Sequence, residues 1–138
     1  MSPAPVHVLV GLIRAADGRW LVNRRRPGTH MAGFWEFPGG KRRADESRLE
    51  ALCRELDEEL GIEVRSATPW LTLVHDYPDK RVLLDVWRVE DFRGEVVARE
   101  GQQCRWVGAE ALEDLDLLPA DRPIIDALLQ VTRQPGRQ

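Results

Sequence analysis

Apolar residues along the chain form strand-like runs and helical stripes, which predict the order of its elements. Residues 6–14 (VHVLVGLIR) are apolar and β-branched, which predicts a buried strand. The AADG turn that follows predicts a connection to a second strand at residues 19–23. Similar patterns predict the later elements: strands within 63–76, at 81–89 and at 103–107, a helical turn at 109–112 and a closing helix at 122–131.

A central helix is predicted to begin at Asp45 and to end before Gly61. Asp45 suits the N-cap position, and Gly61 suits the C-cap. Apolar residues recur at i, i+3, i+4, i+7 and i+11, which predicts one buried stripe made of Leu49, Leu52, Cys53, Leu56 and Leu60. Strand-rich segments on both sides of this helix, with a second helix at the end, predict a mixed α/β sandwich.

Three glutamates lie off this stripe. Glu55, Glu58 and Glu59 share one region of the helix surface because their spacing is i, i+3, i+4. Such a cluster is either a solvated acidic face or a site where a cation offsets the repulsion. The bunching of the carboxylates, the preceding Gly-Gly turn and the neighbouring Arg54 favour the cation site.

The chain has 138 residues, enough for one domain with a core, and no repeat or linker divides it. We therefore expect a single domain over residues 1–138, with an ordered core at about 5–132 and frayed polar residues after it. The net charge of −3 argues against a general nucleic-acid binder, so no stable nucleic-acid partner is expected.

The cysteines and the apolar runs bear on location. Two distant cysteines, without metal or disulfide spacing, fit a reducing compartment. The N-terminus lacks a signal-peptide arrangement, and no apolar run approaches the roughly 20 residues that span a bilayer. We expect a cytoplasmic protein with no membrane partner, present as a monomer or weak dimer.

From Gly40 to Ile62 the sequence reads Gly-x5-Glu-x7-Arg-Glu-Leu-x-Glu-Glu-x-Gly-Ile. This order and spacing resemble the signature box of the Nudix hydrolase family at every specified position. HMAGFWEFPGGK, YPDK, REGQ and LPADRPII are similar to stretches of the MutT-type 8-oxo-dGTP diphosphatases of that family. The resemblance covers residues 6–129 and implies an α/β Nudix fold, a mixed β-sheet sandwiched between α-helices.

The resemblance also implies an activity and a cofactor. Water would attack the β-phosphorus of a nucleoside triphosphate and release a nucleoside monophosphate and pyrophosphate. Mg²⁺, with Mn²⁺ able to substitute, would be bound by the Gly39 carbonyl and by Glu55, Glu58, Glu59 and Glu100. The chemistry of the chain agrees, because carboxylates and a triphosphate repel each other unless cations bridge their oxygens.

Two further box residues receive supporting roles from the same resemblance. Arg54 would hold the glutamates by ion pairing, and Glu46 would anchor the box loop and is a further candidate for base or metal work. A carboxylate of the cluster would accept the proton of the nucleophilic water. Glu55 is the first choice for this base and Glu58 the next, because spacing alone does not separate a ligand from a base.

Substrate contacts are implied outside the box. Arg25 would contact the nucleotide, and Glu36 and Phe37 would line the base pocket. Tyr77 and Lys80 would lie in a loop over the nucleotide.

Asp121 departs from the MutT pattern, which usually has Asn at this position. An ionised carboxylate only accepts hydrogen bonds, whereas an amide both donates and accepts. Asp121 could accept from N1–H of 8-oxoguanine or from the exocyclic amine of cytosine, or it could simply cap the closing helix. A related Nudix branch, the CTP or 5-substituted dCTP pyrophosphohydrolases, has a similar Pro-Ala-Asp-x-Pro run.

Several functions therefore stay open. The first hypothesis is sanitisation of oxidised 8-oxo-dGTP, and the second is hydrolysis of CTP or 5-substituted dCTP. Hydrolysis of a nucleotide sugar or ADP-ribose is a further alternative. A non-catalytic module that senses a nucleotide belongs to another class, and its expected mark would be a broken glutamate cluster, whereas this cluster is intact.

Overall fold

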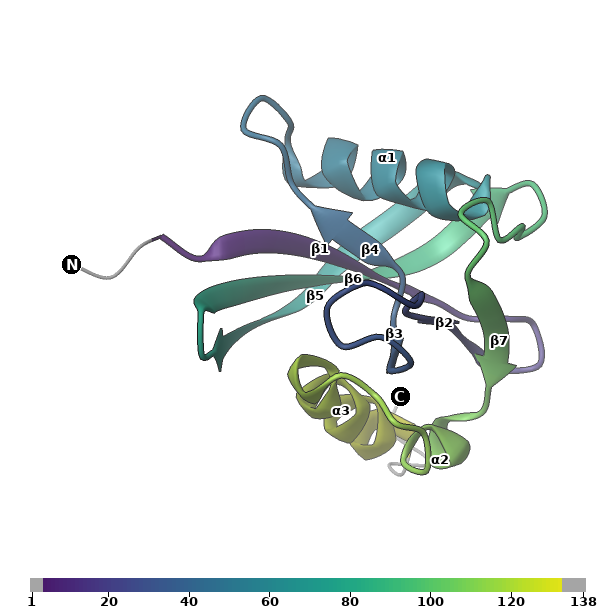
Figure 1. Ribbon diagram of the computed structural model, residues 1–138. Helices are drawn as coiled ribbons and strands as arrows, with labels where there is room; N and C mark the ends of the chain where they lie inside the picture. The colour runs from purple at the N-terminus through teal and green to yellow at the C-terminus, as the bar shows by residue number, and fades with distance from the viewer. Residues whose placement is uncertain (1–3, 133–138) are drawn as a thin grey trace.

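The computed structural model describes residues 4–132 of the chain (Figure 1). Its elements, in chain order, are β1 (Val6–Ile13), β2 (Trp20–Arg24), β3 (Trp35–Glu36), β4 (Gly39–Lys41), α1 (Arg48–Leu60), β5 (Glu63–Tyr77), β6 (Lys80–Arg93), β7 (Gln103–Val107), α2 (Ala109–Leu112), the 3-10 turn η1 (Pro119–Asp121) and α3 (Arg122–Thr132). The expected fraying of residues 133–138 lies outside the described residues. Within 4–132, no helix has the length and apolar character needed to cross a bilayer.

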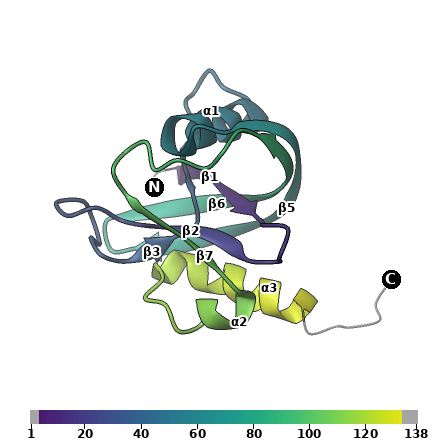
Figure 2. The same ribbon diagram turned by 90° about the vertical axis from the view of Figure 1, so that its right-hand side faces the viewer.

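The strands form two sheets. One has the order β4-β1-β6-β5 and the other the order β3-β2-β7. The larger sheet is mixed, because β1 pairs parallel to β6 and antiparallel to β4. Helix α1 covers one side of the strands, and α2 and α3 cover the other (Figures 1 and 2). The predicted α/β fold with a mixed sheet between helices is confirmed, with the strands divided into two sheets.

Alternation along β1 gives the molecule two cores. Leu9 and Ile13 belong to the core under α1, whereas Val10 and Leu12 belong to the core under α3. Gly11 lies between them, and a Cβ added there would be 3.1 Å from a methyl carbon of Leu56. Helix α1 therefore packs closely onto β1, and the strand fixes the position of the helix.

The predicted N-cap of α1 is wrong by two residues. The N-cap is Ser47, whose hydroxyl accepts from the backbone N–H of Glu50, while the Glu50 carboxylate accepts from the N–H of Ser47. This reciprocal capping box stabilises Ser47 as the helix start, and Asp45 lies in the turn before it. The predicted C-cap is confirmed, since Gly61 has the left-handed conformation at φ 68°.

The buried stripe of α1 differs from the prediction at Leu49 and at Cys53, which is only half-buried. Leu49 is 44% exposed, whereas Ala51 is fully buried together with Leu52, Leu56 and Leu60. Leu49 lies in the first turn, at the edge of the contact with the sheet. Because Ala51 is on the buried face, Glu55 and Glu59, which follow it by four and eight positions, lie beside that face.

The predicted strands at 6–14, 19–23, 63–76, 81–89 and 103–107 correspond to β1, β2, β5, β6 and β7. The helical turn at 109–112 and the closing helix are also confirmed. One difference concerns the expected Gly39-Gly40 turn, which is instead the short strand β4 paired with β1.

Candidate functional site

A cavity of about 470 Å³ opens beside α1 and between the two sheets. Its lining comes from strands β1 to β6, from α1 and η1, and from the loops after β2 and before β7. The lining includes nine of the residues that the sequence assigned to metal or substrate: Arg25, Glu36, Phe37, Gly39, Glu59, Tyr77, Lys80, Glu100 and Asp121. The other four, Glu46, Arg54, Glu55 and Glu58, form a network along α1 and the box loop.

Two glycines bring backbone close to this network. Gly39 has φ 152°, and a Cβ there would lie 1.9 Å from the carbonyl oxygen of Leu9. A Cβ on Gly40 would lie 2.4 Å from the Glu55 carboxylate. The clash at Gly39 is with backbone, so glycine is required there, whereas the contact at Gly40 is with the end of the Glu55 side chain, which could move.

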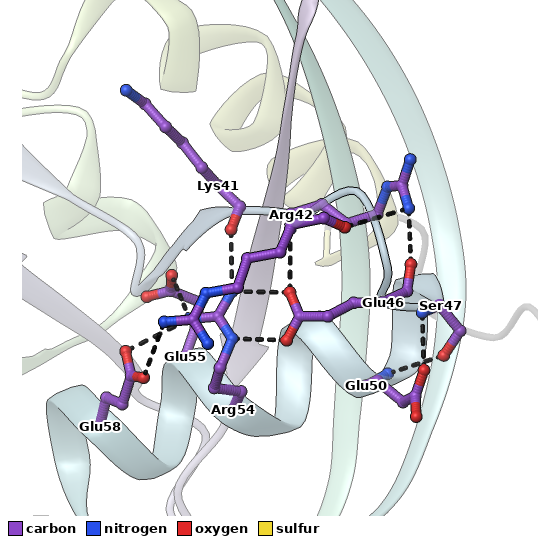
Figure 3. Close-up of polar contacts among 9 residues, drawn as sticks. Lys41, Arg42, Glu46, Ser47, Glu50, Arg54, Glu55 and Glu58 are labelled. Atoms are coloured by element: carbon purple, nitrogen blue, oxygen red, sulfur yellow. Dashed lines mark hydrogen bonds and ion pairs between the residues drawn. The ribbon is translucent and has the colours of Figure 1, made fainter.

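Arg54 is the centre of the network (Figure 3). Its guanidinium binds both oxygens of Glu46, at 2.5 and 2.8 Å, in a bidentate pair. It also donates to Glu55 at 2.9 Å and to Glu58 at 3.3 Å. A further N–H donates to the backbone carbonyl of Lys41 at 3.0 Å. One cation thus holds three carboxylates and the end of β4.

The electrostatics of this network favour the charged forms of Arg54 and Glu46. Hydrogen bonding from Arg54 lowers the pKa of Glu46 to about 2, and the same hydrogen bond raises the pKa of Arg54. Glu46 also accepts from the backbone N–H of Arg43 at 2.9 Å, which ties the box loop to the helix. The geometry is that of a loop anchor.

Glu59 and Glu55 are in a different environment, beside the buried face of α1. Burial, followed by the charge of Glu55, raises the pKa of Glu59 to about 9, although the N–H of Gly39 donates to Glu59 at 3.1 Å. Burial also raises the pKa of Glu55, against the effect of Arg54. Glu58 lies further out, with a side chain 44% exposed.

The residues present fit a hard divalent cation by their donor chemistry. Glu55, Glu58 and Glu59 offer only oxygen donors, and a cation would offset the burial and repulsion that raise the pKa of Glu59 and Glu55. Among residues 4–132, however, no group of three or more His, Cys, Asp or Glu side chains is already arranged to hold a metal. Arg54 binds two of these carboxylates instead, so metal binding would require them to reorient.

The loop before β7 brings Glu100 to the same region. The N–H groups of Val97 and Arg99 donate to the carbonyls of Leu60 and Glu59, which attaches the loop to the end of α1. Gln102, which the sequence analysis did not single out, donates to the Glu59 carbonyl at 3.1 Å and accepts from the N–H of Glu100 at 3.0 Å. Its position in the REGQ stretch is the sequence feature that could have identified it.

Arg25 and Glu36 form an ion pair in the lining of the cavity. One guanidinium nitrogen of Arg25 lies 3.1 and 3.3 Å from the two carboxylate oxygens of Glu36, and the Arg25 Nε donates to the carbonyl of His30. Burial raises the pKa of Glu36, against the nearby charge of Arg25. Tyr77 and Lys80 lie at the β5–β6 turn, with the Lys80 ammonium 6.0 Å from the Tyr77 ring.

Asp121 also lines the cavity and is 4% exposed. Its carboxylate accepts from the backbone N–H of Phe37 at 3.0 Å. Burial raises the pKa of Asp121 to about 7, although this N–H opposes the shift. Asp121 is the last residue of η1 and directly precedes α3, and its carboxylate also contacts a segment distant in sequence through the N–H of Phe37.

Asn23 was missed by the sequence analysis. It lines the cavity from β2, is 5% exposed, and accepts a hydrogen bond from the Cys104 thiol at 3.2 Å. An amide inside an apolar strand is a signal, but only the folded structure shows that Asn23 lines the cavity and is buried from solvent.

Comparison with known proteins gives consistent matches. A family model described as NUDIX domain matches residues 9–127. The chain is 36% identical to an 8-oxo-dGTP diphosphatase of Escherichia coli (strain K12) over 123 residues, 89% of this chain and 95% of the relative. It is 37% identical to a CTP pyrophosphohydrolase of the same organism over 121 residues, 88% and 90% of the two chains. A solved MutT structure, from a study of Aliivibrio salmonicida and Vibrio cholerae, superposes with a TM-score of 0.81 at 32% identity, over 93% of this chain and 99% of the other.

Proposed function

The chain belongs to the NUDIX domain family and is a Nudix hydrolase, and on this premise we propose that it sanitises 8-oxo-dGTP. It would hydrolyse this triphosphate to the monophosphate and pyrophosphate in the presence of Mg²⁺. The observation that carries the proposal is the arrangement around Arg54 and Glu59, which adjoins a cavity with a buried acceptor, Asp121, at its far end.

The acidic end of the cavity would hold the triphosphate through Mg²⁺ or Mn²⁺. Glu55, Glu58, Glu59 and Glu100, with the Gly39 carbonyl, would be the ligands. When bound, the cation would neutralise phosphate charge and make a bound water more acidic. Arg54 orients the carboxylates, and Glu55 is our choice for the group that accepts the proton of the nucleophilic water, with Glu58 as the next candidate.

The far end of the cavity would read the base. Asp121 has one oxygen bound to the N–H of Phe37, which leaves the other oxygen for a donor on the ligand. The N1–H of 8-oxoguanine is such a donor. Arg25 and Glu36 are paired with each other at the rim, and we place them, with Tyr77 and Lys80, around the nucleotide.

A second candidate function is hydrolysis of CTP or a 5-substituted dCTP. Asp121 favours it specifically, because the exocyclic amine of cytosine is also a donor to a carboxylate. The similarity to a CTP pyrophosphohydrolase is of the same order as that to the 8-oxo-dGTP diphosphatase.

Substrate ranking tests the proposal. With Mg²⁺ present, we expect kcat/KM for 8-oxo-dGTP to exceed that for dGTP, CTP and 5-methyl-dCTP. A preference for the cytosine nucleotides would replace the first function by the second. If none of these nucleotides releases pyrophosphate with Mg²⁺ or Mn²⁺, the chain is a nucleotide sensor or acts on a different substrate, and binding of each nucleotide by calorimetry would separate these outcomes.

A further inference from the structure

One carboxylate outside the cavity accepts more hydrogen bonds than any glutamate of the Nudix box. Asp85, on β6, is 1% exposed and lies on the α1 side of the sheet. It accepts from His7 on β1 at 2.9 Å, from two nitrogens of Arg48 at 2.6 and 2.8 Å, and from the Trp87 indole at 2.8 Å. Burial alone would raise the pKa of Asp85, but the hydrogen bonds from Arg48 and His7 outweigh it and lower the pKa. The buried group is an anion.

One of these partners is the first residue of the helix that carries the glutamates. Arg48 begins α1, and its bidentate pair with Asp85 joins that end of the helix to β6. The Arg48 guanidinium also lies 5.0 Å from the centroid of the Trp87 ring. Planar, two-point contacts of this kind fix direction as well as distance.

The other partner, His7, relays the contact to the box loop. Its Nδ1 accepts from Arg42 at 3.3 Å. Because Arg42 can only donate, the hydrogen of a neutral His7 ring must be on Nε2, facing Asp85. Arg42 in turn donates to the backbone carbonyl of Glu46 at 2.5 Å, as Figure 3 shows. Glu46 then binds Arg54.

We propose that Asp85 is a positioning residue for the hydrolysis. Through Arg48 it holds the start of α1. Through His7 and Arg42 it holds the loop at Glu46, so that Arg54 meets the glutamates in one geometry. The effect on turnover rests on the proposed function, whereas the effect on the Arg54 contacts does not.

The substitution Asp85→Asn tests this with little change in volume. All four hydrogen bonds to Asp85 come from donors, so an amide NH₂ would face at least one of them. His7 is the partner able to adapt, by moving its hydrogen to Nδ1. It could then no longer accept from Arg42, and the link to Glu46 would be lost.

In the activity test, kcat and KM are measured with 8-oxo-dGTP and Mg²⁺. We expect Asp85→Asn to lower kcat by about tenfold to 100-fold, with KM changed less than about twofold, because the base end of the cavity is untouched. Leu129→Ala is the control for general destabilisation, since it opens a cavity in the core under α3. Wild-type kcat in Asp85→Asn, or an equal loss in Leu129→Ala at a matched fall in Tm, would overturn the proposal.

A second variant covers the case in which Asp85→Asn does not fold. Arg42→Met removes the half-exposed link while leaving the buried carboxylate paired with Arg48. We expect it to lower kcat in the same direction. If both variants fold, their losses should be less than multiplicative, because the two residues act along one path. Multiplicative losses of kcat, or wild-type kcat in Arg42→Met, would show that Asp85 does not act through His7 and Arg42.

The Arg54 side chain gives a readout without substrate or metal. In ¹⁵N-labelled protein the Nε–H signal of Arg54 reports its hydrogen bond to Glu46. We expect this signal to shift and exchange faster with water in Asp85→Asn and Arg42→Met. It should stay unchanged in Asp17→Asn, which breaks an exposed pair with Arg19 at another turn.

The two readouts separate the two proposals. If the wild-type protein does not hydrolyse 8-oxo-dGTP but the Arg54 signal responds, the proposed substrate is wrong and the positioning role stands. If the protein hydrolyses 8-oxo-dGTP while both variants keep the wild-type Arg54 signal and kcat, the positioning role is wrong.

Discussion

At the α1 end of the site, Arg54 binds carboxylates that lie one, four and eight positions away along the chain, whereas at the base end Asp121 meets a backbone amide 84 positions away. The first arrangement needs only a helix and the loop before it. The second exists only when η1 reaches the end of β3. The carboxylates that we propose for the reaction chemistry on α1 and its preceding loop are therefore brought together locally, whereas the residue that we propose reads the base is placed by tertiary assembly.

The two ends also differ in how they stabilise charge. Around Arg54, ion pairing outweighs desolvation and lowers the pKa of Glu46 to about 2. At Asp121 burial dominates and raises the pKa to about 7. The environment of Arg54 thus keeps its partner charged and oriented. The environment of Asp121 leaves a buried carboxyl that would bind one hydrogen-bonding group of the base under our proposal.

The largest effect should come from neutralising the glutamates at the α1 end. We expect Glu55→Gln and Glu58→Gln each to lower kcat for 8-oxo-dGTP by about 100-fold or more, because each removes a charge from the acidic cluster. Circular dichroism and Tm should show a retained fold. Turnover near the wild-type value in both variants would contradict the proposed metal site at Glu55 and Glu58.

Gly39→Ala should be the most damaging change to stability. Its Cβ would lie 1.9 Å from the Leu9 carbonyl oxygen, so β4 could not pair with β1. We expect the free energy of unfolding in urea to fall by about 4 kcal/mol or more. Gly101→Ala is the matched control, because Gly101 also has positive φ, 75°, but has nothing within 4 Å of its Cβ position. An equal loss in both variants would show that backbone conformation, not contact with Leu9, sets the requirement.

Asp121→Asn should change substrate choice more than metal dependence. The amide can donate where the ionised carboxylate only accepts, so at a pH above 7 the ratio of kcat/KM between 8-oxo-dGTP and CTP should change by about tenfold or more. The Mg²⁺ concentration at half-maximal rate should stay close to the wild-type value. An unchanged ratio would show that Asp121 supports Phe37 and does not read the base.

The same variant makes a prediction about pH and stability. The folded-state pKa of Asp121, about 7, lies above the ordinary aspartate pKa of 3.8, so the folded state holds this proton more tightly. The contribution of Asp121 to the free energy of unfolding is fully present below about pH 4 and is lost as pH rises through 7. As the pH rises from 4 to 8, we expect the unfolding free energy of Asp121→Asn to increase relative to that of the wild type. A constant difference over that range would show that Asp121 is ionised throughout.

The smallest effect concerns the helix start. Ser47→Ala removes the side-chain acceptor for the N–H of Glu50, and we expect a loss of about 1 kcal/mol in unfolding free energy. Asp45→Ala is the control, because the structure places Asp45 before the cap. A larger loss in Asp45→Ala would restore Asp45 as the residue that begins the helix.

Much of the α1 end could be predicted from spacing, because helical geometry places residues four apart on one side. The cap was missed because Asp45 and Ser47 are both good N-cap residues, and only the partnership of Ser47 with Glu50 decides between them. Asn23, Asp85 and Gln102 could not be assigned from sequence, since their partners lie on distant segments. Asp121 was singled out, but its contact with Phe37 required the fold.

The place of β1 has a consequence for how such a protein can change over evolutionary time. This strand is flanked on both sides, by β4 and β6, and its residues contribute to both cores. Substitutions near Gly39 and Leu9 therefore put folding and turnover at risk together. Residues around Arg25 and Asp121 lie in a loop and a short turn, so, if they read the base as we propose, new base preferences can arise there while the residues on α1 stay unchanged.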